Sequence, residues 1–190
     1  MKLVWDTSSL SHAFEEFSHA AASAYMRMRG ARTWRKLKGL LLKRISSEAR
    51  SRRLLLDCDV NECLVPLGVY REVAADPHFT DSLDLLTGYG RRVEERYKEK
   101  DIAGFAATFK PRLVIKTVRP SLVDYVLVRA REMGLDISRA DAEGVALAIE
   151  QGATLVTADG RQARVARSLG VRVIYTIGGK YWTREKKERT

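Results

Sequence analysis

The sequence predicts an α/β protein built around a short parallel sheet. Short apolar runs alternate with amphipathic helical patterns at the spacing of parallel strand–helix–strand units. Four acidic residues fall where predicted strands or helices begin or end: Asp6, Glu72, Asp141 and Asp159. The chain has 190 residues, 45% of them hydrophobic, and can bury a full core. We therefore expect one domain over residues 1–177 and a charged tail over residues 178–190.

The first half of the chain combines strands with basic helices. Residues 1–6 predict a buried strand, and a helix from Ser8 or Ser9 follows, with apolar residues three and four apart up to Gly30. A second helical pattern runs from Trp34 to Ile45, inside a basic helical insertion over about residues 30–55. Residues 54–56 continue this helix or start a strand, residues 57–61 connect, and residues 63–65 form a strand. Pro66 suits the first turn of a helix that ends at residue 74 or 75.

The second half of the chain shows the alternation more regularly. Residues 81–97 predict a helix, and residues 113–118 a β-branched strand. A helix from Pro120 to Met133 stops at Gly134, and Ser138 caps the next helix, which ends at Gly152. Strand 154–157, helix 161–169 and strand 171–176 complete the pattern.

The charge balance points to a polyanionic partner. The net charge is +10 and the isoelectric point is near 9.8, which favours nucleic acid over a membrane surface. Between residues 27 and 53, eleven lysines and arginines face one acid, Glu48. A solvated helix face is the alternative, but so strong a bias of sign favours phosphate contacts. The residues expected to bind RNA are Arg32, Arg35, Lys36, Lys38, Lys43, Arg44 and Arg161.

Hydropathy and cysteine content limit the setting of the protein. No apolar stretch reaches the length of about 20 residues that crosses a bilayer, and the N-terminus meets a charge too early for a secretory signal. We expect a soluble cytoplasmic protein with no membrane partner. Cys58 and Cys63 lack further Cys or His ligands at zinc spacing. A reduced, buried pair is the preferred interpretation, and a stabilising disulfide is the alternative.

The four acids predict a metal site. In parallel α/β sheets, groups at the carboxyl ends of strands and at nearby helix starts converge on one crevice. Carboxylates that meet there repel one another unless a divalent cation holds them, so we expect Mg²⁺ or Mn²⁺ and a phosphate substrate. Each acid also has a structural alternative. These are a capping box of Asp141 with Ser138, an N-cap for Asp159, a cap of the first helix for Asp6, and one exposed helix acid among many for Glu72.

Several sequence blocks resemble PIN-domain nucleases when they are taken in order. They are Leu3-Val4-Trp5-Asp6-Thr7-Ser8, Val69-Tyr70-Arg71-Glu72-Val73, Ile137-Ser138-Arg139-Ala140-Asp141-Ala142-Glu143-Gly144-Val145-Ala146-Leu147-Ala148, Thr154-Leu155-Val156-Thr157-Ala158-Asp159, and Val165-Ala166-Arg167-Ser168-Leu169-Gly170-Val171. The family's four acids fall on Asp6, Glu72, Asp141 and Asp159, and its accompanying hydroxyl falls on Thr157, with Ser8 as a second supporting residue.

The resemblance implies a PIN-like three-layer α/β/α sandwich with a short, mainly parallel sheet, and cleavage of RNA with Mg²⁺ or Mn²⁺. In layout the chain is similar to the PIN nuclease that matures the 3′ end of small-subunit ribosomal RNA. That enzyme carries a zinc ribbon after its PIN domain, whereas no cysteine follows Cys63 here. The small toxin ribonucleases of the family are the second choice, and their interval between the first two acids is shorter.

The predicted function is a metal-dependent endoribonuclease, with ribosomal RNA processing as one possible role. One alternative is a toxin-type ribonuclease controlled by an antitoxin. Another is an RNA- or protein-binding module with weak catalysis, and a third is a structure-specific nuclease that acts on DNA. The expected partners are RNA, a second copy of the chain, and an antitoxin or a ribosome-assembly protein.

Overall fold

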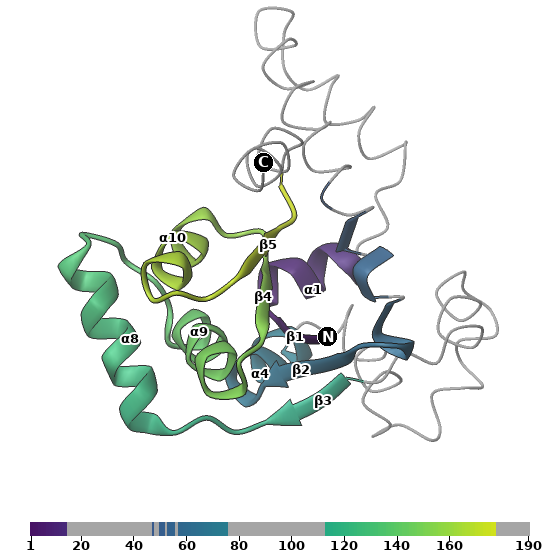
Figure 1. Ribbon diagram of the computed structural model, residues 1–190, viewed down its shortest axis with the longest axis horizontal. Coiled ribbons are helices and arrows are strands. Elements are labelled where there is room, and N and C mark those ends of the chain that lie inside the picture. The colour runs from purple at the N-terminus through teal and green to yellow at the C-terminus, as the bar shows by residue number, and fades with distance from the viewer. Residues whose placement is uncertain (15–46, 48–49, 52, 56, 76–112, 178–190) are drawn as a thin grey trace, which may run out of the picture.

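The computed structural model describes residues 1–14, 47, 50–51, 53–55, 57–75 and 113–177 (Figure 1). The predicted helices over residues 34–45 and 81–97 and the tail over residues 178–190 lie outside this set. Of the basic insertion, residues 47, 50–51 and 53–55 are described, and they are helical. The boundaries of the domain and of the insertion therefore stay predictions.

A five-stranded parallel sheet forms the centre of the described structure. Its strands are β1 (Lys2–Trp5), β2 (Glu62–Pro66), β3 (Leu113–Lys116), β4 (Thr154–Thr157) and β5 (Val173–Tyr175). They lie in the order β3-β2-β1-β4-β5, and every neighbouring pair is parallel. The central strand β1 has Val4 opposite Leu64 of β2 on one side and Leu155 of β4 on the other. The predicted α/β class with a parallel sheet is confirmed.

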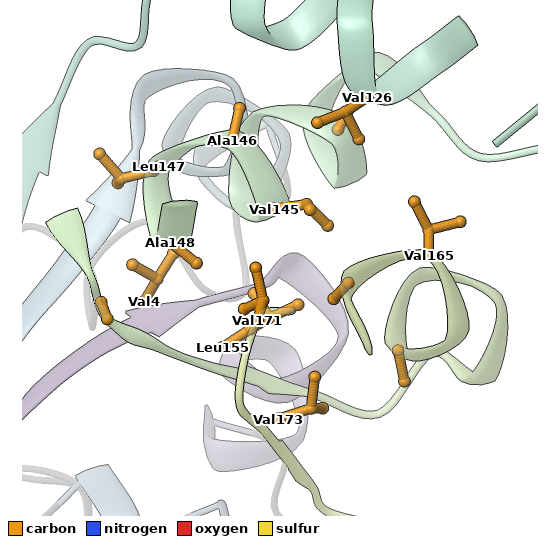
Figure 2. Close-up of a cluster of buried hydrophobic side chains, with 14 of the residues drawn as sticks. Val4, Val126, Val145, Ala146, Leu147, Ala148, Leu155, Val165, Val171 and Val173 are labelled. Atoms are coloured by element: carbon orange, nitrogen blue, oxygen red, sulfur yellow. The ribbon is translucent and has the colours of Figure 1, made fainter. Parts of the chain in front are cut away.

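Helices cover both faces of this sheet. They are α1 (Thr7–Phe14), α4 (Leu67–Ala74), α8 (Pro120–Glu132), α9 (Arg139–Gln151) and α10 (Gly160–Ser168), with a 3₁₀ turn η1 (Asp57–Asp59) before β2. Leu3 and Trp5 of β1 pack in a core with α1 and α4, whereas Val4 and Leu155 pack in a second core with α8, α9 and α10 (Figure 2). This three-layer arrangement is as predicted, and it explains why the strands read as continuous apolar runs.

Local sequence signals set the ends of α8 and α9. Ser138 forms a capping box at the start of α9, and Gly152 ends that helix in the left-handed conformation at φ 59°. Pro120 stands in the first turn of α8. None of the described helices is long and apolar enough to cross a membrane.

Pro66 departs from the prediction. It was expected in the first turn of a helix, but it is the last residue of β2 and pairs with Lys116 of β3. Its φ of −60° and ψ of 146° are extended, and α4 begins one residue later, at Leu67. The fixed φ of proline suits an extended residue as well as a helical one, so the parallel pairing with β3 decides between them.

The two cysteines also depart from the preferred interpretation. Cys58 of η1 and Cys63 of β2 form a disulfide, so the expectation of a reduced pair is wrong and the alternative holds. The turn of η1 brings their Cα atoms to 5.6 Å, a separation that a disulfide spans. Both residues are buried beside the first core, where the bond ties the start of β2 to the preceding turn.

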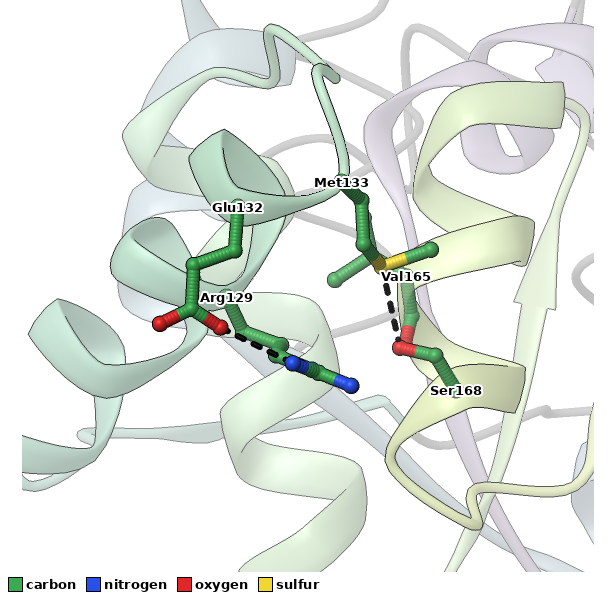
Figure 3. Close-up of polar contacts among 5 residues, drawn as sticks. All are labelled: Arg129, Glu132, Met133, Val165 and Ser168. Atoms are coloured by element: carbon green, nitrogen blue, oxygen red, sulfur yellow. Dashed lines mark hydrogen bonds and ion pairs between the residues drawn. The ribbon is translucent and has the colours of Figure 1, made fainter.

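The C-terminal ends of α8 and α10 lie in contact (Figure 3). Ser168 Oγ of α10 lies 3.2 Å from Met133 Sδ just after α8, and it also contacts the carbonyl oxygen of Val165 at 2.8 Å. An ion pair of 2.8 Å joins Arg129 and Glu132 within α8. Helix α10 is thus held at its C-terminal end as well as by its core residues.

Candidate active site

The strand order brings two predicted acids to one edge of the sheet. From β1 the chain continues to β2 and β3 on one side, and β4 and β5 lie on the other side of β1. In open α/β sheets, ligands bind outside the carboxyl ends of the strands at such a reversal. Asp6 directly follows β1, and Asp159 follows β4 by two residues. The structure therefore places both acids at the reversal point between neighbouring strands.

Asp6 is the most unusual residue at this edge. Its side chain is 1% exposed, and only one of its two carboxylate oxygens has partners. Oδ2 accepts hydrogen bonds from the Ser8 hydroxyl, from Ser8 N–H at 3.3 Å and from Thr157 Oγ1 at 2.8 Å. Oδ1 is buried and has no hydrogen-bond partner among the residues that the structure describes. A buried oxygen of this kind is available to a ligand that the protein itself does not provide.

The surroundings of Asp6 favour its neutral form. Burial raises the pKa of Asp6 to about 6, against the hydrogen bonds from Ser8 and Thr157, which lower it. The charges of Asp141 and Asp159 add to the increase. These two acids are therefore within electrostatic range of Asp6.

Ser8 and Thr157 join the ends of β1 and β4. Thr157 Oγ1 donates to Asp6 and accepts from Asp159 N–H at 2.9 Å. Ser8 Oγ donates to Asp6 and accepts from Ala158 N–H at 3.0 Å. Each hydroxyl thus serves once as donor and once as acceptor, which fixes its proton and the orientation of the Asp6 carboxylate.

Asp159 and Asp141 fill the structural roles that the sequence left open for them. Asp159 is the N-cap of α10, where its Oδ1 accepts from Arg161 N–H at 2.6 Å and Gln162 N–H at 3.3 Å. Asp141 completes the capping box of α9 by accepting from Ser138 N–H at 2.8 Å through Oδ2. Each cap uses one carboxylate oxygen. Among the described residues the second oxygen of each has no hydrogen bond, so capping and metal binding are compatible.

Glu72 reaches the same edge through Thr7. It is an exposed residue of α4, and its Oε2 accepts a 2.6 Å hydrogen bond from Thr7 Oγ1, next to Asp6 in the chain. In the described part of the chain, no three Asp, Glu, His or Cys side chains are arranged so that they could hold a metal ion. The four predicted acids thus border one edge without forming a complete set of direct ligands.

A divalent cation nevertheless fits the chemistry of this edge. Mg²⁺ takes oxygen ligands, keeps several waters and is commonly bound through one or two carboxylates. Asp6 Oδ1 is a buried oxygen without a partner among the described residues. A cation would also offset the negative charge of the neighbouring acids that raise the pKa of Asp6. Asp6 and Asp159 could ligate such an ion directly, with waters reaching Glu72 and Asp141.

Two residues that link the site helices were not predicted for the site. Gln162 of α10 is fully buried and donates from Nε2 to the carbonyl oxygen of Asp141 at 2.9 Å. Glu143 of α9 is half-buried and accepts from Gly68 N–H of α4 at 2.7 Å. Gln162 stands three residues after the N-cap Asp159, the position of a capping-box glutamine, and this signal could have identified it.

Of the predicted RNA-binding residues, only Arg161 is described. It is exposed in the first turn of α10, two residues after Asp159. The other six, Arg32, Arg35, Lys36, Lys38, Lys43 and Arg44, lie outside the described residues.

Comparison with known proteins gives general similarity of backbone. No protein-family model matches the sequence, and no curated protein is significantly similar to it. The crystal structure of FitAcB from Neisseria gonorrhoeae aligns with a TM-score of 0.44 at 16% identity, over 92% of this chain and 97% of that chain. VapBC2 from Rickettsia felis, bound to a DNA fragment from its promoter, aligns with a TM-score of 0.49 at 15% identity, over 92% and 98% of the two chains. At these values the assignment of a function depends on the residues of the chain itself.

Proposed function

We propose that this protein is a divalent-metal-dependent nuclease that hydrolyses phosphodiester bonds in RNA. The observation that carries this proposal is Asp6, which is buried at the carboxyl end of the central strand with one oxygen held and the other unpartnered. Asp141 and Asp159 are close enough to raise its pKa. A buried acid at a strand end whose charge is disfavoured by two neighbouring acids is expected where a cation belongs.

Each residue of the edge has a role in this proposal. A bound Mg²⁺ or Mn²⁺ supplies an acidified water and offsets charge on the phosphoryl group. Asp6 and Asp159 are direct ligands, and Glu72 and Asp141 act through water or complete a second metal position. Ser8 and Thr157 orient Asp6 by donating to Oδ2, which leaves Oδ1 as the ligand atom.

Charge and sequence motifs support RNA as the substrate. The net charge is +10, and the exposed Arg161 lies two residues from Asp159. The strand-end acids and their neighbours also resemble the motifs of PIN-domain nucleases. A homodimer is part of the proposal on the strength of that resemblance.

Two narrower roles follow from the same resemblance. Ribosomal RNA processing rests on the layout of the sequence. A toxin-type ribonuclease controlled by an antitoxin is the second candidate. In that case this chain would form a complex comparable to VapBC2, which was crystallised with a DNA fragment from its promoter. Adding the product of an adjacent gene should abolish cleavage in the toxin-type case, whereas it should leave an RNA-processing enzyme active.

The proposal is tested by cleavage of labelled single-stranded RNA with Mg²⁺ or Mn²⁺. We expect cleavage by the wild-type protein, no cleavage in EDTA, and loss of at least a hundredfold in Asp6→Asn and Asp159→Asn. The matched control is Asp124→Asn, an exposed acid of α8 whose 3.5 Å ion pair with Arg139 is at the surface.

The outcomes separate the alternatives. Wild-type protein that binds RNA but cuts neither ribosomal nor messenger-like RNA with either metal would favour the binding module. Cleavage of DNA in preference to RNA would favour a DNA-directed nuclease. Cleavage that persists in both strand-end variants would contradict the site.

A further inference from the structure

A second feature of the structure, a pocket beside Asp159, contains three arginines. It has a volume of about 560 Å³ and is formed by α10 and β5. Arg161, Arg164 and Arg167 line it from α10, Tyr175 lines it from β5, and Asp159 stands at its border with the candidate active site. A volume of this size is in the range of small-ligand sites.

The arginines form a row along one side of α10. They are spaced three residues apart, so at 1.5 Å per residue the row extends over about 9 Å of the helix axis. Helix α10 contains no acidic residue, and none of the three forms an ion pair with another described residue. Neighbouring guanidinium groups repel one another, and bound anions would offset this repulsion.

The helix that carries this row is firmly held. Ala163, Val165 and Ala166 are buried in the second core, and Ser168 contacts Met133 at the far end of the helix. At its start, Asp159 caps the helix and Gln162 bonds to the carbonyl oxygen of Asp141. The arginines therefore extend from a fixed element, which is the arrangement that preorganised phosphate binding requires.

We propose that Arg164, Arg167 and Tyr175 form a subsite for the RNA strand immediately beside the bond that is cut. This inference rests on the proposed function for the identity of the strand. One guanidinium group can donate two parallel hydrogen bonds to two oxygens of a phosphate. A row of such groups therefore suits the successive phosphates of a nucleic-acid strand better than it suits a single anion. Tyr175 supplies an aromatic wall against which a base can stack.

Binding of a labelled 12-nucleotide single-stranded RNA to the full chain in EDTA tests the subsite without catalysis. We expect Arg164→Gln/Arg167→Gln to weaken binding about tenfold and to lower the slope of log affinity against log salt by about 1.4, or about 0.7 for each lost phosphate contact. The control, Arg129→Gln/Arg131→Gln, removes the same charge from exposed positions of α8 and should stay within about twofold.

Tyr175 is tested with a pair of substitutions. Tyr175→Leu should weaken binding about tenfold, whereas Tyr175→Phe keeps the ring and should stay within about twofold. Thermal unfolding of each variant confirms that it is folded. Equal weakening by Leu and Phe would contradict stacking by the ring.

Four further outcomes bear on the proposal. Equal weakening by the α10 and α8 pairs would overturn the subsite in favour of general charge attraction. If the α10 pair of substitutions abolishes binding of adenosine monophosphate but leaves binding of the 12-mer intact, the pocket binds a free nucleotide and the RNA subsite is overturned. If the subsite results hold but no RNA is cut, the proposed function fails alone. If cleavage depends on Asp6 and Asp159 while the α10 pair binds and cuts as the wild type does, the subsite fails alone.

Discussion

Asp6 is a single side chain of the candidate active site that lowers the stability of the fold. It is buried, its pKa is raised to about 6, and one of its oxygens lacks a partner. In the metal-free protein at neutral pH, the charged form loses hydration that the hydrogen bonds from Ser8 and Thr157 only partly replace. A residue that destabilises the fold in this way is expected where function selects it.

The first prediction concerns Asp6→Asn in EDTA. Asp6 is protonated in both folded and unfolded chains well below pH 3.8, and it is ionised in both well above pH 6. Because the folded pKa is the higher one, wild-type stability decreases through this group as pH rises from about 4 to about 6. Asparagine does not titrate. The stability of the variant relative to the wild type should therefore improve by roughly 2 kcal/mol between pH 4 and pH 7.

Urea unfolding at the two pH values measures this difference. Asp124→Asn, at an exposed position, serves as the control and should change little between pH 4 and pH 7. An equal stability difference for Asp6→Asn at both pH values would show that burial does not raise the pKa of Asp6.

For single residues, the sequence predicted where the acids lie in the fold better than it predicted which hydrogen bonds they form. Asp6 and Asp159 were expected together because both follow strands of a parallel sheet, and they do lie at one edge. The one-sided hydrogen bonding of Asp6 was not foreseeable, since it depends on Thr157, which is 151 residues away in the chain. The position of Gln162 after the N-cap could have identified it, but its partner, a backbone carbonyl on another helix, could not be foreseen.

Among the secondary-structure elements, β2 departs from expectation because of the elements that border it. The predicted strand 154–157 matches β4 exactly, since its apolar run is bounded by Gly152 and Asp159. The strand predicted at residues 63–65 is extended to Pro66 by pairing with β3, and a disulfide anchors its other end. Neither the neighbour of a strand nor the approach of two sulfurs is encoded in local periodicity.

The second prediction concerns this disulfide. Replacing both cysteines, as in Cys58→Ala/Cys63→Ala, should lower the free energy of unfolding by about 2 kcal/mol, as expected for closing so short a loop. Urea unfolding with and without a reducing agent measures the effect. The reducing agent should destabilise the wild type and leave the variant unchanged. An identical midpoint for reduced and oxidised wild type would show that the bond does not stabilise the fold.

For the molecule as a whole, a bound cation should appear as added stability. A ligand that binds only the folded state stabilises it by about 2.7 kcal/mol at a hundredfold excess over its Kd. Our third prediction is that Mn²⁺ or Mg²⁺ raises the melting temperature of the wild type and of Asp124→Asn. We expect little or no increase for Asp6→Asn and Asp159→Asn. An equal increase in all four proteins would indicate general ion binding, and this measurement does not depend on finding the right RNA.

The position of β1 at the middle of the sheet also has a consequence for synthesis of the chain on the ribosome. A growing chain can pair β1 with β2, and β2 with β3, before β4 is made. The other edge of β1 stays open until then, some 150 residues after β1. Thr157, which holds Asp6, and Asp159 arrive only with that late strand. The hydrogen bond that orients Asp6 therefore forms only after β4 has been made, although Asp6 itself is among the first residues of the chain.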